Sequence, residues 1–455
     1  MSGVGFGGDS GLTRLKSRVH VDACPSDATE VACPRLLKIL VVHQYYLMPG
    51  QSGGSRFNEM SRVWSEKGHE VTVIAGTMNH DTGKAPERYR GKWVTEERDG
   101  AVKVLRCHVP GTYGKSYAGR MWAFFGFTLS AATAGLRSAR ADVVIATSPP
   151  LVAVIPGWIA ARWRRRPSPW IFEIRDLWPE SAVTTGVIAK DALITRVLYA
   201  LEKWACAAAS RINVLTPAFR EDLVARGLAC EAKISFIPNG ADLDRFVPGP
   251  RENAVRAEFG WGDRFVAMYA GAHGRANAVD QLLGAAEILK SRPDILIACV
   301  GDGTERKRLE GEAKARGLTN IRFYGAHPKD RMPEIVRACD LGMAVLQNNP
   351  TFRTVYPNKV FDYMSCGRPV LVAIDGVART LICEQAGAGV FAEPENAASL
   401  AGEIRGLADD PGRCAEFGEK GRQWVLANAG REGLAERYLE VMQNLVAMRR
   451  AAGES

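Results

Sequence analysis

Short, continuous apolar runs recur along the chain, and each is followed by a turn and then by a stretch that suits a helix. The first run is the segment Arg35-Leu-Leu-Lys-Ile-Leu-Val-Val42. A strand that is apolar along its whole length must be buried on both faces, and parallel sheets with helices on both sides provide such burial. The pattern therefore predicts an α/β protein built on doubly wound parallel sheets.

The runs fall into two sets, which predict two domains. In the first half they lie at residues 35–42, 70–76, 102–106, 142–147, 170–174 and 211–215; in the second half at 265–270, 295–300, 321–324, 341–346 and 370–373. A chain of 455 residues exceeds what one hydrophobic core organises. We predict Rossmann-like domains over residues 35–248 and 249–430, and a C-terminal helix with a tail over 431–455.

The N-terminal segment and the composition indicate the cellular compartment and the kind of ligand. Residues 1–34 are rich in Gly, Ser, Asp and Pro, and Met1 to Val19 lacks the apolar core of a signal peptide. We predict a disordered extension, or a start upstream of the true one. The ten cysteines form no CxxC pair, which indicates reduced, cytosolic residues. Lysine and arginine exceed aspartate and glutamate by 59 to 50. This excess favours an anionic ligand or membrane surface, and no nucleic-acid recognition motif accompanies it.

The stretch Tyr356 to Ala373 has the features of a phosphate-binding helix. Pro357 suits a first helical turn, and Lys359 and Asp362 then lie on one helical face. Gly367 ends the helix before a buried strand. A cation and a carboxylate there could hold a nucleoside diphosphate, with Lys359 on phosphate and Asp362 on ribose hydroxyls. The alternative is a solvated ion pair between these two side chains.

This stretch resembles the donor-binding motif of the retaining glycosyltransferases of family four. The match is best with the fucosaminyltransferase-like subgroup of bacterial O-antigen and capsule assembly. The family motif has two glutamates separated by seven residues, and here Thr354 and Asp362 take their places. The resemblance covers about residues 36 to 448. It implies the GT-B fold, in which an N-terminal acceptor domain and a C-terminal nucleotide-sugar domain face each other across a cleft. It also implies that the C-terminal helix crosses back to the first domain.

The resemblance also implies where the donor binds. Gly53 and Gly54 would lie over the diphosphate, Arg275 and Lys359 would neutralise it, and the His327 turn would hold the uracil base. The glycine turns after the strands at 265–270 and 295–300 would form the rest of a nucleotide-binding rim. The full set of predicted donor-binding residues is Gly53, Gly54, His273, Gly274, Arg275, Gly303, His327, Asn358, Lys359 and Asp362.

The predicted catalytic residues follow the strand at 170–174. Chemistry in doubly wound folds collects beyond the carboxyl ends of strands, so Arg175, Asp176 and Glu180 are the candidates. Asp176, with Glu180 second, would orient or deprotonate the acceptor hydroxyl. The alternative is a salt-bridged turn with Asp176 as a helix cap. Many family members use a histidine of the first domain, and the strand that ends at Thr147 presents Ser148 and Pro149 instead.

The segment Tyr117 to Gly135 contains Arg120 as its one charged residue and several aromatic ones. Its glycine, serine and threonine residues and its place within the βα repeat argue against a membrane span. It is either a buried helix or a helix whose Trp and Phe face enters a membrane interface. The sequence Arg162-Trp163-Arg164-Arg165-Arg166 supports the second alternative.

Together these features predict a retaining glycosyltransferase that moves an N-acetylated amino or deoxyamino sugar from a UDP-sugar. The acceptor would be an undecaprenyl-diphosphate-linked sugar at the inner face of the cytoplasmic membrane, in surface polysaccharide biosynthesis. We expect no metal and no cofactor besides the UDP-sugar, since no compact ligand set appears and Asp242-x-Asp244 suits a turn. The alternatives are a sugar-nucleotide epimerase, a non-catalytic subunit, and an oxidoreductase, for which a GxGxxG fingerprint is missing.

Overall fold

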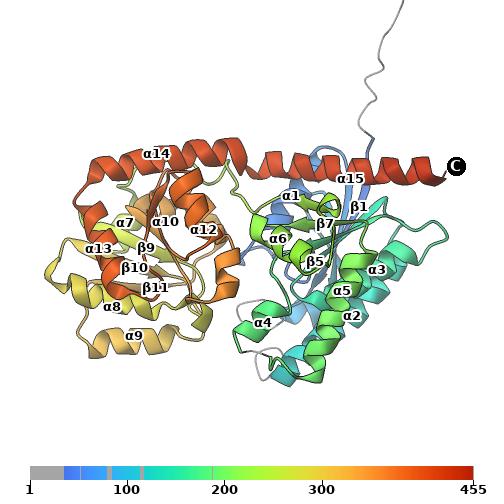
Figure 1. Ribbon diagram of the computed structural model, residues 1–455, viewed down its shortest axis with the longest axis horizontal. Coiled ribbons are helices and arrows are strands. Elements are labelled where there is room, and N and C mark those ends of the chain that lie inside the picture. Colours follow the sequence, from blue (N-terminus) through green and yellow to red (C-terminus); the bar gives the residue numbers. More distant parts are fainter. Residues whose placement is uncertain (1–34, 52, 79–84, 113–116, 187, 454–455) are drawn as a thin grey trace, which may run out of the picture. The chain divides into compact units, whose positions relative to one another are not determined.

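The structure is a computed structural model that describes residues 35–51, 53–78, 85–112, 117–186 and 188–453 (Figure 1). The predicted disordered extension, residues 1–34, lies outside the described residues. Within these ranges the strands form two sheets, one of eight and one of six strands. Both sheets have helices on their two faces, so the predicted GT-B architecture of two Rossmann-like halves is confirmed.

The first sheet has the strand order β3-β4-β2-β1-β5-β6-β7-β8. Its strands are β1 (Lys38–Val42), β2 (Glu70–Gly76), β3 (Val94–Asp99), β4 (Val102–Cys107), β5 (Val143–Ser148), β6 (Trp170–Ile174), β7 (Arg211–Val214) and β8 (Ile234–Phe236). All neighbours pair in parallel except β3 and β4. Strand β3 was not predicted, because its sequence VTEERD lacks an apolar run; such a charged strand suits a sheet edge.

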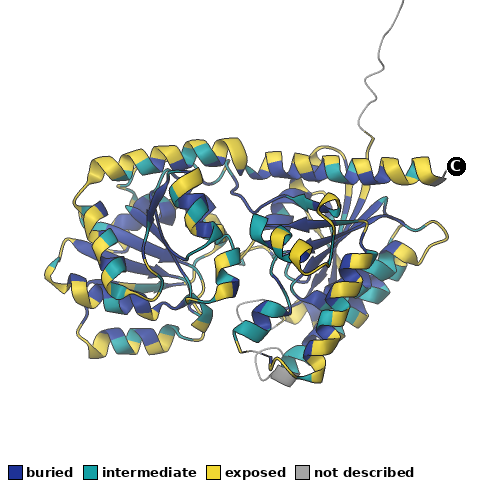
Figure 2. Cartoon of the chain, viewed as in Figure 1, coloured by how far each residue is buried: buried dark blue, intermediate teal, exposed yellow. Residues whose placement is uncertain are grey.

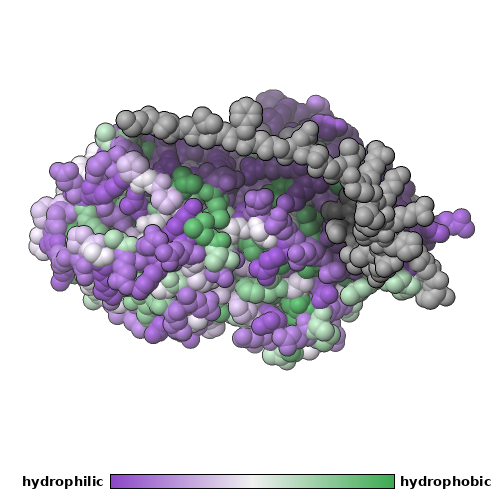
Figure 3. Space-filling model, turned by 90° about the horizontal axis from the view of Figure 1, so that it is seen from above, coloured by the Kyte–Doolittle hydropathy of each residue, from purple (hydrophilic) through white to green (hydrophobic). Residues whose placement is uncertain are grey.

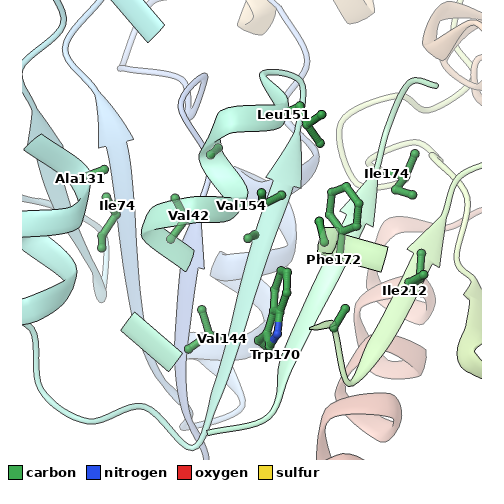
Figure 4. Packing of buried hydrophobic residues seen from close by; sticks show 14 of the residues in the cluster. Val42, Ile74, Ala131, Val144, Leu151, Val154, Trp170, Phe172, Ile174 and Ile212 are labelled. Atoms are coloured by element: carbon green, nitrogen blue, oxygen red, sulfur yellow. The ribbon is translucent and has the colours of Figure 1, made fainter. Parts of the chain in front are cut away.

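Side chains alternate between the two faces of the first sheet and build two cores. Leu40 and Val42 of β1 face one core, whereas Ile39 and Val41 face the other. Figure 4 shows Val42, Val144 and Phe172 of neighbouring strands packed with residues of the covering helices. The helices of this half are α1 (Arg56–Glu66), α2 (Tyr117–Arg137), α3 (Val154–Arg162), α4 (Glu180–Thr184), α5 (Leu193–Ala208) and α6 (Pro217–Ala225). Continuous apolar strands are thus buried on both faces, as their sequences require.

The second sheet has the strand order β11-β10-β9-β12-β13-β14, and all its pairs are parallel. Its strands are β9 (Phe265–Ala270), β10 (Ile295–Val300), β11 (Ile321–Gly325), β12 (Leu341–Val345), β13 (Val370–Ala373) and β14 (Gly389–Phe391). Its helices are α7 (Ala254–Glu258), α8 (Asp280–Ile288), α9 (Arg306–Ala315), α10 (Met332–Ala338), α11 (Asn358–Ser365), α12 (Val377–Arg379), a π-helical turn (Thr380–Gln385), α13 (Ala397–Ala408) and α14 (Pro411–Asn428). As the predicted motif requires, α11 lies between two strands of the same sheet.

The last helix, α15 (Arg431–Gly453), packs on the first sheet rather than on the second (Figure 1). Trp64 of α1 donates from its indole N–H to the carbonyl of Ala435 at 2.9 Å, and its ring meets the ring of Tyr438 edge-on at 5.6 Å. The chain therefore passes between the two sheets twice. The two crossings are hydrogen-bonded to each other, since Ala241 N–H donates to Ala429 and Arg431 N–H donates to Ala241.

The burial of residues reflects the arrangement of sheets between layers of helices. In Figure 2 the strands are buried and the outer faces of the helices are exposed. On the face that Figure 3 shows, hydrophilic residues cover most of the surface and hydrophobic ones gather in small groups, as on a surface that faces water. Within the described ranges, no helix is both long enough and apolar enough to cross a membrane.

Helix α2 has features of both a buried helix and a helix with an exposed aromatic face, the two alternatives predicted for residues 117–135. Ala123, Phe127 and Ala131 are buried against the sheet. Trp122 and Phe125, by contrast, are 57% and 56% exposed, so the opposite face of the helix carries uncovered aromatic rings.

Candidate functional site

Turns that follow three neighbouring strands meet at the carboxyl edge of the second sheet. Gly271 follows β9, Gly301 follows β10 and Gly325 ends β11. The N–H of Gly301 donates to the carbonyl of Gly325 at 2.7 Å. Gly301 has φ +140°, and a Cβ there would lie 1.9 Å from the carbonyl oxygen of Gly271. Only glycine fits such a close stack of backbone, so the predicted rim of glycine turns is present.

His273 lies buried within this rim. Its backbone is packed against Gly303, where a Cβ would lie 2.5 Å from the carbonyl oxygen of His273. Its ring stacks on Tyr269 at 5.8 Å. Burial, assisted by the positive charges of Arg306 and Lys359, lowers the pKa of His273 to about 4, so the ring is neutral at physiological pH. We conclude that His273 shapes the rim and adds no charge to it.

Lys359, the second residue of α11, is the cation at the rim. Its Nζ lies 3.7 Å from the centre of the Tyr269 ring, and a Cβ at Gly271 would lie 2.6 Å from that atom. Among the described residues, no carboxylate forms an ion pair with Lys359. Burial lowers its pKa to about 7. A desolvated ammonium without a counter-ion, next to glycine backbone, is suited to bind an anion.

Residues of the first half reach the same place. A Cβ at Gly54 would lie 3.6 Å from Nη2 of Arg175 and 3.7 Å from Nδ2 of Asn358. Asn358 begins α11, and Gly54 lies two residues before α1, so two helix N-termini and one guanidinium meet here. Helix N-termini offer free N–H groups and a positive dipole end to an anion. Gly53 precedes this contact with φ +130°.

Arg175 is hydrogen-bonded to His43, the residue that follows β1. Nη1 of Arg175 donates to Nε2 of His43 at 3.2 Å. Since an arginine only donates, Nε2 is the accepting nitrogen, and Nδ1 carries the hydrogen that is donated to Oγ1 of Thr147 at 2.8 Å. Burial, with the charge of Arg175, lowers the pKa of His43 well below its usual value and keeps this neutral form. Burial also lowers the pKa of Arg175 to about 10.

Asp362 and Lys359 do not pair with each other. Oδ2 of Asp362 accepts from Nζ of Lys329 at 3.3 Å, and Lys329 also lies 4.7 Å from the centre of the Phe246 ring. Burial raises the pKa of Asp362, while Lys329 opposes that rise. The two predicted site residues of α11 thus have different environments, and the alternative of a solvated pair between them is wrong.

Asp176 and Glu180 are both engaged within the first half. The carboxylate of Asp176 accepts from Oγ of Ser181 at 2.8 Å, and burial raises its pKa. Glu180 accepts from the hydroxyl of Tyr199, and burial together with this carboxylate raises the pKa of Tyr199. Asp176 is therefore tied to the first turn of α4 through Ser181. The N-cap of α4 is Pro179, and Asp176 forms no ion pair among the described residues, so the alternative of a salt-bridged helix cap is wrong. The raised pKa of Asp176 suits a proton acceptor.

The remaining predicted residues lie around the rim. Gly274 donates from its N–H to Oδ1 of Asn277 at 3.4 Å, which begins the turn that carries Arg275. Arg275 is exposed and lines a surface cavity of about 840 Å³ with residues of α8 and α9. His327 lies tilted against Phe259 at 5.4 Å, and burial lowers its pKa. The structure thus groups Arg175, rather than Arg275, with Gly54 and Asn358.

Three residues of the site were missed by sequence reasoning. His43 follows directly on a buried strand, a position that could have drawn attention to it. Lys329 and Tyr269 carried no comparable signal, because their contacts with Asp362 and Lys359 join elements that are 33 and 90 residues apart.

Comparison with known proteins identifies the family of both halves. The sequence model of the glycosyl transferase 4-like domain matches residues 53–240, and that of the glycosyl transferases group 1 matches residues 252–424. WcaI of Escherichia coli (strain K12), whose name assigns it to colanic acid biosynthesis as a glycosyl transferase, is 24% identical over 378 residues, 81% of this chain and 91% of WcaI.

Solved structures show the same fold. The sucrose-phosphate synthase of Thermosynechococcus elongatus superposes with a TM-score of 0.69 at 19% identity, covering 91% of this chain and 100% of that one. Anabaena Alr3699/HepE, solved in complex with UDP and glucose, gives a TM-score of 0.66 at 19% identity over 89% of this chain and 99% of its own. The two matched domains and the shared fold lead to one conclusion: the chain belongs to the glycosyltransferases that join a glycosyl transferase 4-like domain to a group 1 domain, and it has the GT-B fold.

Proposed function

We propose that this glycosyltransferase moves an N-acetylated amino or deoxyamino sugar, with retention and without a metal ion, from a UDP-sugar to a lipid-linked sugar. The reaction would belong to surface polysaccharide biosynthesis, with the protein peripheral to the inner face of the cytoplasmic membrane. The name of WcaI supports the polysaccharide role, and the complex of HepE with UDP supports the nucleotide. The motif at residues 354–362 supports the fucosaminyltransferase-like subgroup. So does the segment Arg175-Asp-Leu-Trp-Pro-Glu-Ser181 after β6, which is similar to the signature of that subgroup. Both matching family models describe glycosyl transferases, so an epimerase is not favoured.

One observation carries the proposal: two cations that form no ion pair with a carboxylate among the described residues lie beside glycine backbone. Lys359 lies against Gly271, and Arg175 lies next to Gly54. A departing diphosphate develops negative charge in the transition state, and preorganised cations and helix N-termini stabilise that charge. We assign the diphosphate to Lys359, Gly54 and Arg175. Arg175 thus replaces Arg275 as the arginine expected to neutralise the diphosphate.

The other donor contacts follow from the same rim. The carboxylate of Asp362 would accept from the ribose hydroxyls, and the charge of Lys329 opposes the rise in the pKa of Asp362 that burial causes. The turn at His327, which follows β11, would hold the uracil base. Fixed cations supply the charge that a divalent ion supplies in other sugar-nucleotide enzymes, which is the physical reason for expecting no metal.

Asp176 is the proposed group that orients or deprotonates the acceptor hydroxyl. We expect Asp176→Asn to lower kcat about 10²-fold or more, because the amide keeps the size of the side chain but cannot take a proton. The measurement is steady-state sugar transfer, with the exposed Asp263→Asn as the matched control. Wild-type turnover in Asp176→Asn would reduce Asp176 to its contact with Ser181.

The proposed function is tested by thermal unfolding of the purified protein with UDP, GDP, ADP or NAD, each with EDTA or magnesium. A ligand at about 100 times its Kd adds about 2.7 kcal/mol to stability. We expect UDP to raise Tm, equally with EDTA and with magnesium, and release of UDP from a UDP-sugar to require a lipid-linked acceptor. A preference for NAD, no response to any nucleotide, or acceptor-independent conversion would contradict the proposal.

A further inference from the structure

Two helices on one side of the first sheet expose apolar stripes. On α2, Trp122, Phe125 and Leu129 are 57%, 56% and 50% exposed, and the rings of Trp122 and Phe125 stack at 5.7 Å. On α5, Leu193 and Val197 are 77% and 52% exposed. The spacings of three or four residues put each set on one helical face. Large apolar side chains that gather in this way mark an interaction surface.

The two stripes belong to one region of the molecule. Helices α2 and α5 both pack against the short turn Leu151–Ala153 that precedes α3, and they lie close to α3 in Figure 1. The segment after α3 is tied to the end of α2, because Nη2 of Arg164 donates to the carbonyl of Ser138 at 2.6 Å. In this segment Trp163 is 67% exposed. We call the exposed residues of α2, α5 and residues 162–166 the apolar-basic face.

The charge of this face selects its partner. The segments 117–137, 154–166 and 193–208 contain eight arginine or lysine residues and one acidic residue, Glu202. Glu202 is buried and already paired with Arg226, so its charge is not available at the surface. The basic residues are Arg120, Arg137, Arg162, Arg164, Arg165, Arg166, Arg196 and Lys203. Exposed aromatic rings flanked by more cations than carboxylates fit an anionic lipid headgroup region.

The apolar-basic face lies near the site, as a lipid-linked acceptor requires. Helices α2, α3 and α5 follow strands of the parallel sheet, so α2 and α5 begin at its carboxyl edge, where Arg175 and His43 lie. Leu193 opens α5, and Trp122 and Phe125 lie in the first half of α2, so exposed apolar side chains lie toward that edge. A bilayer against this face would therefore present lipid headgroups beside the edge at which sugar transfer occurs.

We propose that the apolar-basic face docks on the surface of an anionic phospholipid bilayer, with the α2 and α5 stripes in the interface and residues 162–166 on the headgroups. The inference rests on the proposed function, since it specifies the membrane contact of that enzyme. Docking occurs in the interface plane and needs no helix that spans the membrane.

The test is co-sedimentation of the full chain with vesicles of phosphatidylcholine alone or with phosphatidylglycerol, at low and high salt. We expect binding to the anionic vesicles only, weakened by salt. Leu129→Ser should weaken binding several-fold, whereas Leu426→Ser, at 51% exposure a matched control, should not. Arg165→Ser with Arg166→Ser should lower binding about fivefold per cation. The pair Arg405→Ser with Arg413→Ser, which removes the same charge elsewhere, should have little effect.

Other outcomes overturn the inference. Equal binding to neutral and anionic vesicles, or equal effects of the matched variants, would remove the assigned role of this face. A dimer in size-exclusion chromatography that Leu129→Ser dissociates would assign the face to a second copy of the chain. The UDP-induced rise in Tm is measured in every variant. A variant that keeps this rise but loses vesicle binding separates docking from the donor site, and failure of the UDP response in the wild type contradicts the proposed function alone.

Discussion

A Lys359→Met variant is expected to bind UDP about 10- to 100-fold more weakly than the wild type at pH 7. The estimate follows from the loss of a charge-assisted contact, about 1.5–3 kcal/mol, between the ammonium and the diphosphate. The unliganded variant should be at least as stable as the wild type, because it no longer buries a charge that has no carboxylate partner among the described residues. Calorimetric titration gives the affinity, and thermal unfolding gives the stability.

Lys359 also predicts the pH dependence of donor binding. In the unliganded protein its pKa is about 7, lowered by burial. A bound diphosphate favours the charged form and raises that pKa, so binding takes up a proton. The affinity for UDP should therefore be highest below pH 7 and fall up to about tenfold per pH unit above it. The terminal phosphate of UDP is already ionised there, because its pKa is near 6.

The matched control for this pH dependence is Lys359→Arg. A guanidinium stays charged over the whole range, so the affinity of this variant should be nearly constant from pH 7 to 8.5. Proton uptake is measured independently by repeating the titration in buffers of different ionisation enthalpy. A wild-type affinity that is flat over this range, or a Lys359→Arg variant that keeps the wild-type slope, would show that Lys359 does not contact the phosphates.

Arg175→Ala is expected to lower kcat about 10²- to 10³-fold, the usual effect of removing one donor that stabilises developing negative charge. The burial that lowers the pKa of Arg175 also means that the fold gains nothing from this charge, so Tm should change little through electrostatics. Arg175→Lys should recover only part of the loss, since an ammonium cannot reach both His43 and the region of Gly54. A kcat within a factor of a few of the wild type would contradict the role.

His43 is expected to act through Arg175, as a positioning residue. His43→Ala should lower kcat about tenfold with little change in KM for the UDP-sugar, because the guanidinium remains but is no longer held. His43→Gln should restore much of the rate, since its amide oxygen can accept from Nη1 of Arg175. If Gln and Ala have the same effect, the ring serves packing against Phe57 rather than the guanidinium.

Much of the fold could be read from the sequence. The apolar runs of β1, β5, β6, β9 and β10 predicted buried parallel strands, because only burial on both faces accommodates such runs. The charged β3 was missed, since an edge strand is determined by its pairing with β4 and has no apolar pattern of its own. The start of α11, with Pro357, Asn358 and Lys359, was predicted from local chemistry alone.

The sequence by itself determined what is local: two sets of βα units, glycine turns after strands, and the cation at the start of α11. Tertiary structure alone decided which distant groups meet. It grouped Arg175 rather than Arg275 with Gly54 and Asn358, paired Asp362 with Lys329, and fixed the tautomer of His43 through Arg175. The physical reason is that strand order and helix packing bring together groups far apart in the chain, whereas a sequence pattern reports only on neighbours along it.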